Sequence, residues 1–199
     1  MSEKTYFTME ELIGFIDEPN RSACFQILKE NEVLFKQIPG STHNHQTFKS
    51  GYYYHILDCM NYAYHLYDFD ASFGRPLPFS KSDALLILYL HDLEKPWRIE
   101  VMPDGTVRNR PGLDTKESFK KFREDKLEEY GIILSKEQLN GLTYVEGEIK
   151  DYSSTHRVMN ELAAFCHQCD NWSARAWYAY PLESNDPWIG ADRVRTIKK

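Results

Sequence analysis

The sequence has few cysteines, no long apolar run and no excess of basic residues. Its 199 residues include only four cysteines, too few for the disulfide framework typical of small secreted domains. No apolar stretch approaches ~18 residues, so we expect no membrane-spanning helix and no membrane partner. The first residues lack the basic-then-apolar order of a signal peptide, so the sequence predicts a cytoplasmic protein.

The charge balance argues against a protein that binds extended nucleic acid. The chain carries a formal net charge of −6, whereas a surface that binds extended nucleic acid is basic, so we expect no such binding. A local basic pocket for one phosphate group remains compatible with this charge. The hydrophobic fraction of 42% is that of a folded domain, and there is no internal repeat. We therefore predict one domain over residues 1–199, and an oligomer is compatible with the sequence.

Cys166 and Cys169 form a CxxC motif inside a helix-like segment, with no second CxxC in the chain. A structural zinc site needs about four such ligands. All four cysteines, including Cys24 and Cys59, are therefore predicted to be buried free thiols.

Capping and turn signals divide the chain into short helices. Thr8 with Glu11, Ser80 with Asp83, and Ser135 with Gln138 predict three helix starts. The predicted helices cover about 8–17, 20–37, 51–67, 80–95, 114–130, 135–144 and 154–180, and a turn at 103–105 predicts a small hairpin. The expected fold is all-α with one small β-hairpin: N-terminal helices in 1–39, a core in 40–180 and a tail in 181–199.

Four residues far apart in the sequence suggest a metal site: His55, the pair His91–Asp92, and Asp170. Each lies in an apolar, helix-like segment, where an unpaired carboxylate is costly to bury. A mixed set of imidazoles and carboxylates suits a divalent metal ion. Each residue alone is better explained as a core histidine or a surface carboxylate, but the ordered set favours metal ligation.

The segments around these residues resemble the HD-domain metal-dependent phosphohydrolases, whose pattern is H…HD…D. Residues 44–55, NHQTFKSGYYYH, resemble the "NHHAYxGGLLxH" segment of the branch that contains 3′–5′ exoribonucleases. Residues 91–95, HDLEK, are similar to "HDIGK", and residues 170–175, DNWSAR, to "DNLDAK". The resemblance covers about residues 40–180.

This resemblance implies an HD-domain helical bundle whose central helices direct His55, His91, Asp92 and Asp170 to one divalent metal ion (Mn, Fe, Ni, Co, Zn or Mg). It implies a phosphohydrolase, a nucleotidase or phosphodiesterase. The enzyme would cleave a phosphomonoester or phosphodiester of a nucleotide-like substrate through a metal-bound hydroxide. The catalytic residues would be Lys95, His45 and Asp92, and the substrate-binding residues Asn44, Lys49 and Arg175.

The chain departs from the family pattern at two places. Glu94 replaces a glycine, which adds negative charge beside the expected pocket. Val145 and Glu146 replace the two histidines of "HHGE" that hold a second metal in the related branch. We therefore expect one tightly bound metal, with Glu146 as the sole candidate ligand for a second ion in this segment.

Two questions stay open at this stage. A small nucleotide is preferred as substrate over a nucleic-acid 3′ end, because the additional nucleic-acid-binding domain of the exoribonucleases is missing. The alternative is a catalytically inactive HD-fold regulatory or ligand-binding protein, although such proteins usually lose the His-Asp pair that is intact here. If Asp92 serves only a metal, Asp92→Ala should leave the fold mostly intact.

Overall fold

The chain is mostly helical, with one small two-stranded antiparallel sheet, as the sequence predicts. The computed structural model describes residues 5–42 and 44–178, so the predicted tail at 181–199 lies outside the described residues. The helices are α1 (Met9–Gly14), α2 (Asn20–Phe35), α3 (Gly51–Ala71), α4 (Lys81–Leu90), α5 (Lys95–Arg98), α6 (Lys116–Glu129), α7 (Lys136–Tyr144) and α8 (Glu161–Ala176), with a 3-10 turn η1 (Ile149–Asp151).

Three helix starts confirm the capping signals read from the sequence. The side chains of Thr8, Ser80 and Ser135 each accept a hydrogen bond from the backbone N–H three residues on. The side chain of that later residue in turn accepts from the backbone N–H of the capping residue. Such boxes satisfy N–H groups that the helix itself leaves unpaired. Local sequence therefore decides where α1, α4 and α7 begin.

Three helix boundaries differ from the prediction. The helix expected at 51–67 continues to Ala71, and the one expected at 154–180 begins only at Glu161. Asn160 starts this last helix, because its side chain accepts from the backbone N–H of Ala163 at 2.8 Å. α4 ends at Leu90, and residues 91–94 form turns before the separate short helix α5.

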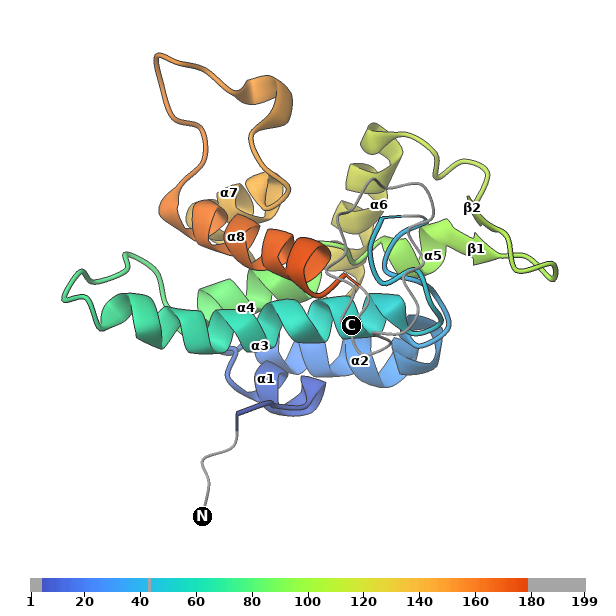
Figure 1. Ribbon diagram of the computed structural model, residues 1–199, viewed down its shortest axis with the longest axis horizontal. Helices are drawn as coiled ribbons and strands as arrows, with labels where there is room; N and C mark the ends of the chain where they lie inside the picture. The colour runs from blue at the N-terminus through green and yellow to red at the C-terminus, as the bar shows by residue number, and fades with distance from the viewer. Residues whose placement is uncertain (1–4, 43, 179–199) are drawn as a thin grey trace, which may run out of the picture.

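The predicted hairpin is present. β1 (Ile99–Val101) pairs antiparallel with β2 (Val107–Asn109), with Glu100 opposite Arg108. Asp104 fixes the turn by accepting from the backbone N–H of Thr106 at 2.9 Å, and Gly105 supplies the positive φ of 83°. The hairpin projects from one end of the molecule beside α6 (Figure 1).

The core lies around α3 and α4. α3 packs against both α4 and α8, α7 packs against α8 and α4, and α1 closes the other side (Figure 1). Every residue of α4 from Ala84 to Leu90 is buried, so this helix has no solvent face over that stretch. All four cysteines are free and buried, as predicted. Within the described chain, no helix is both long and apolar enough to cross a bilayer.

One carboxyl group in the core is expected to make stability depend on pH. Asp58 on α3 is 1% exposed, and its Oδ1 accepts from the Tyr6 hydroxyl at 2.5 Å. Its Oδ2 has no hydrogen-bond partner among the residues that the structure describes. Burial raises the pKa of Asp58 to about 7 in spite of the Tyr6 bond, whereas the ordinary value is 3.8.

Because the folded-state pKa is raised, Asp58 stabilises the fold fully below about pH 4, and the contribution is lost as pH rises through about 7. Asp58→Asn should remove this slope, with an unfolding free energy at pH 8 about 1–3 kcal/mol above that of the parent. Urea denaturation at pH 5.5 and pH 8 measures the difference. The exposed Asp114→Asn is the control, and equal slopes for the parent and Asp58→Asn would contradict the prediction.

Candidate metal centre

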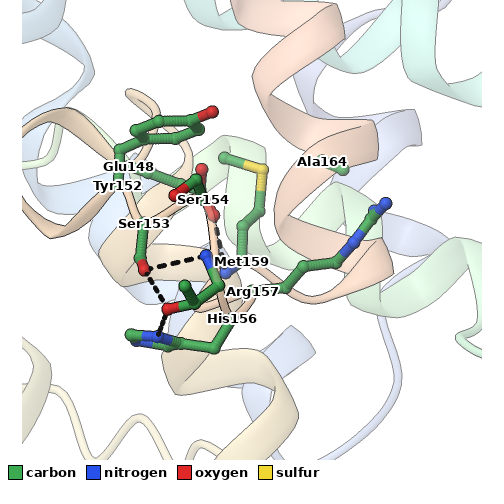
Figure 2. Close-up of a pocket in the computed structure, with 9 residues that line it drawn as sticks. Glu148, Tyr152, Ser153, Ser154, His156, Arg157, Met159 and Ala164 are labelled. Carbon is green, nitrogen blue, oxygen red and sulfur yellow. Dashed lines mark hydrogen bonds between the residues drawn. The ribbon is translucent and has the colours of Figure 1, made fainter.

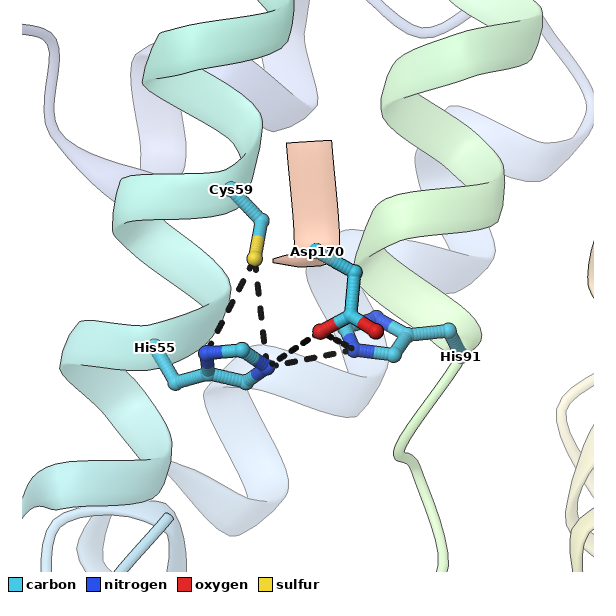
Figure 3. Close-up of side chains that lie close together, drawn as sticks. All are labelled: His55, Cys59, His91 and Asp170. Atoms are coloured by element: carbon cyan, nitrogen blue, oxygen red, sulfur yellow. Dashed lines mark hydrogen bonds and ion pairs between the residues drawn. The ribbon is translucent and has the colours of Figure 1, made fainter. Parts of the chain in front are cut away.

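The predicted set of two imidazoles and two carboxylates comes together from three helices. α3 contributes His55, the end of α4 contributes His91 and then Asp92, and α8 contributes Asp170 (Figure 3 shows His55, His91 and Asp170). His55 Nε2 lies 3.1 Å from Asp170 Oδ1 and 3.6 Å from Asp92 Oδ2. His91 Nε2 lies 3.3 Å from Asp92 Oδ2, 3.7 Å from Asp170 Oδ1 and 3.4 Å from His55 Nε2.

These separations match those of ligands around one ion. Donor atoms that each lie about 2.0–2.2 Å from a shared metal are about 3.0–3.5 Å from one another. The five distances above fall within a few tenths of an ångström of that range. The donor set therefore fits a divalent cation without a large rearrangement.

The two imidazole rings are oriented from outside the cluster. His91 Nδ1 lies 2.7 Å from the carbonyl oxygen of Leu88, and His55 Nδ1 lies 3.0 Å from Ser173 Oγ. When the Nδ1–H of each ring donates to its oxygen, the lone pair of each Nε2 is available to bind a cation at the centre of the cluster. Ser173 thus orients His55 from the helix that carries Asp170.

The electric field of the cluster favours added positive charge. Burial lowers the pKa of His91, but the carboxylates of Asp92 and Asp170 outweigh that effect and raise it to about 10. Burial also opposes ionisation of Asp170, yet hydrogen bonds with His55 and His91 hold its pKa well below the usual range. A site that holds a proton so firmly also attracts a cation.

A cysteine joins this cluster. His55, Cys59, His91 and Asp170 could hold a metal ion, with ligand atoms all within 4.8 Å of one another (Figure 3). Cys59 lies one turn after His55 on α3, and this spacing of four residues is the feature of the sequence that indicates their proximity. Its Sγ is 3.8 Å from Nδ1 and 3.9 Å from Nε2 of His55, so it faces the middle of the ring and not the Nε2 lone pair. Asp92 is better placed as the fourth ligand.

Lys95 is buried beside Asp92. Its Nζ donates to Asp92 Oδ2 at 2.5 Å and to the carbonyl oxygen of Gly40 at 2.9 Å. Burial lowers the pKa of Lys95, but Asp92 outweighs that effect and raises it. Lys95 is therefore a fixed positive charge at this site and a poor proton donor.

A cavity of about 370 Å³, here called the metal cavity, opens onto the cluster. Its walls include five residues proposed from the sequence beyond the metal ligands, namely Asn44, His45, Lys95, Glu146 and Arg175. Lys49, which the sequence suggested as a substrate contact, does not line it: its side chain is exposed on the loop before α3. The structure thus brings together all of the predicted site residues except Lys49.

His45 is held in place by its neighbour Gln46, which the sequence reading missed. His45 Nδ1 lies 2.6 Å from Gln46 Oε1, and its ring centroid is 4.5 Å from that of His55. Burial lowers the pKa of His45 well below its usual value, so the ring is neutral at pH 7. The buried Gln46 also donates to the carbonyl oxygen of Trp177 at 3.0 Å and so joins this loop to the end of α8.

Gly51 permits the close approach of that loop to α3. A Cβ at this position would lie 1.7 Å from the carbonyl oxygen of Gln46 and 2.8 Å from the backbone nitrogen of Gly40. Gly51→Ala is therefore expected to displace the loop and cost about 1–3 kcal/mol or more, because backbone must move. Thermal denaturation measures this cost. Gly14→Ala, which meets nothing within 4 Å, is the control, and equal stability of the two variants would contradict the prediction.

The segment that resembles "HHGE" in the sequence analysis offers few ligand atoms to the cluster. Val145 is buried and has no donor atom, whereas Glu146 is exposed at the edge of the metal cavity. His167, which the sequence reading left as a surface or packing residue, also lines this cavity. Its Nδ1 lies 2.7 Å from the Val145 carbonyl oxygen and its Nε2 2.9 Å from Asn171 Nδ2, so both ring nitrogens are already bonded.

Glu94 lies beside the metal cavity, as expected from the sequence, and does not line it. The side chain is buried, ion-paired with Arg98 at 3.2 Å, and lines a neighbouring pocket. Its carboxylate is thus engaged in the neighbouring pocket.

A larger cavity of about 490 Å³ lies in the loop between α7 and α8 (Figure 2). Its polar residues include Ser153, Thr155 and His156, which are linked by hydrogen bonds of 2.9 and 3.5 Å. No residue of the predicted site lines it, and it has no carboxylate pair or metal-ligand cluster. The metal cavity is therefore the better candidate for an active site.

Comparisons with known protein families, with curated proteins and with solved structures found no match to this chain.

Proposed function

We propose that this protein is a metal-dependent phosphohydrolase of the HD type, acting on a phosphomonoester or phosphodiester of a small nucleotide. The observation that supports it most is the convergence of His55, His91, Asp92 and Asp170 at metal-ligand spacing beside a polar cavity. A divalent ion held by these residues would supply charge neutralisation and water activation when bound.

The surrounding residues take distinct roles in the proposed reaction. Lys95 supplies a fixed positive charge for a phosphoryl oxygen, because its raised pKa keeps it protonated. The neutral His45, with Nδ1 facing Gln46 Oε1, has Nε2 as an acceptor and is the residue suited to take a proton from the attacking water. Arg175 lies exposed on the rim of the metal cavity, where its guanidinium can contact a phosphate.

One metal ion per chain is expected to bind tightly. Val145 has no donor atom and both nitrogens of His167 are engaged, so Glu146 alone remains as a weak oxygen ligand in this region. Elemental analysis after exhaustive dialysis should give one equivalent of metal. Two firmly held equivalents would contradict this expectation.

Metal-depleted protein reloaded with Mn²⁺, Co²⁺, Ni²⁺ or Mg²⁺ should release phosphate or nucleoside from a panel of nucleotides and from a chromogenic phosphodiester. Activity should vanish with chelator and return with metal. Tight metal binding without turnover of any of these substrates would instead favour the alternative, a catalytically inactive HD-fold binding protein. The bonds of Lys95 to Asp92 and Gly40 are the observation that favours that alternative, since they engage the lysine internally.

A further inference from the structure

A second, smaller cavity of about 230 Å³ adjoins the metal cavity. We call it the basic pocket; its walls are Glu94, Arg98, Lys116, Phe119, Lys120, Arg123 and Glu146. Four cationic side chains face two carboxylates there, in a chain whose net charge is −6. The local excess of positive charge therefore contrasts with the rest of the protein.

Much of this positive charge is not neutralised inside the protein. Glu94 is engaged by Arg98 at 3.2 Å and lies 4.0 Å from Arg123. Lys116 forms no ion pair within the described part of the chain, and Lys120 lies 3.8 Å from Glu124 on the exposed face of α6. The buried Nε of Arg98 has no hydrogen-bond partner among the described residues, and neither has Oε2 of Glu94. An unsatisfied buried N–H beside the ammonium group of Lys116, in a pocket where four cations face two carboxylates, is suited to a bound anion.

The two arginines of the basic pocket are held by contacts with the protein, and the pocket adjoins the metal cavity. The guanidinium of Arg98 stacks 4.2 Å above the ring of Phe119, and Arg123 donates to the carbonyl oxygen of His91 at 2.5 Å. Glu146 lines both cavities. An anion in the basic pocket would therefore lie in the cavity next to the one that contains Asp92 and Asp170.

We infer that the basic pocket binds a second phosphate group of the substrate, so that the enzyme binds nucleotides carrying at least two phosphates more tightly than monophosphates. This inference rests on the proposed function, since the first phosphate is the one placed at the metal centre. Arg98 covers one face of the Phe119 ring, and Phe119 is the one aromatic residue among the pocket walls, so the charged side chains make up most of the surface offered to a ligand. Arg98 and Arg123 lie beside the Glu94 carboxylate, so Lys116 and Lys120 supply the positive charge that is left for a ligand.

The double variant Lys116→Ala/Lys120→Ala removes two positive charges from the basic pocket. The control, Lys29→Ala/Lys121→Ala, removes two positive charges from exposed positions outside it. Calorimetry on metal-depleted protein should show pyrophosphate binding about tenfold weaker in the pocket variant and little changed in the control. With metal, KM for nucleoside triphosphates should rise about tenfold while KM for nucleoside monophosphates and kcat stay within twofold. Circular dichroism and melting temperature check that both variants fold.

Equal loss of pyrophosphate binding in the pocket variant and the control would overturn the inference, as would equal shifts in KM for mono- and triphosphates. Pocket-dependent pyrophosphate binding in a protein that hydrolyses no nucleotide would support the pocket and refute the proposed function. Turnover of monophosphates with no pyrophosphate binding by the parent would support the function and refute the pocket.

Discussion

Asp170→Asn is expected to fold like the parent, to bind metal at least ~100-fold more weakly and to lose roughly 1,000-fold in turnover. The amide keeps the shape of the carboxylate but removes its charge, and the 3.1 Å between Asp170 Oδ1 and His55 Nε2 is the shortest of the five separations in the cluster. The remaining carboxylate, Asp92, is already bonded to Lys95 and cannot compensate fully. Calorimetry with Mn²⁺ and steady-state kinetics on the same preparation measure the two losses.

Asp114→Asn is the matched control, because Asp114 is exposed and lies outside the metal cavity. It should bind metal and turn over substrate like the parent. Parent-like metal affinity in Asp170→Asn would refute the proposed ligand set, whereas weak binding with full turnover would refute the role of the metal in catalysis.

Asp92→Ala is expected to destabilise the metal-free protein by about 3–5 kcal/mol, a fall of roughly 6–20 °C in melting temperature. Sequence alone suggested that removing this buried carboxylate would leave the fold intact. The structure leads to the opposite expectation, because Asp92 accepts from the buried Lys95 at 2.5 Å and its loss leaves an ammonium with only the Gly40 carbonyl oxygen. Thermal denaturation in the presence of a chelator isolates this effect from metal binding.

The double variant Asp92→Ala/Lys95→Met distinguishes a buried charge from a general packing defect. Removing the lysine charge as well should restore most of the lost stability while metal affinity stays low. A double variant as unstable as Asp92→Ala would show that the pair is not the cause. An Asp92→Ala protein as stable as the parent would refute the role assigned to Lys95.

Features set by a few neighbouring residues could be predicted from the sequence. The capping side chains of Thr8, Ser80 and Ser135 fix helix starts through bonds only three residues long. The turn at 103–105 likewise determines its own hairpin. The grouping of His55, His91, Asp92 and Asp170 was predicted from motif order, and the structure brings these side chains together.

Features that depend on long-range contacts could not be predicted in this way. Gln46 bonds to Trp177, and Ser173 bonds to His55 across the core. The basic pocket combines Arg98 with residues of α6 that read as an ordinary solvated helix face in the sequence. The start of α8 was missed for a different reason: the capping signal of Asn160 is local, but it was overlooked within a longer helical pattern.

The distribution of the cluster over α3, α4 and α8 has a consequence for the order of events during synthesis. His55, His91 and Asp92 leave the ribosome well before α8, which carries both Asp170 and Ser173. A nascent chain that ends before α8 thus has an incomplete ligand set and an imidazole without its Ser173 partner. Docking of α8 onto α3 and α4 is then the step that completes the cluster, so under the proposed function capture of an ion would follow folding of the last described helix.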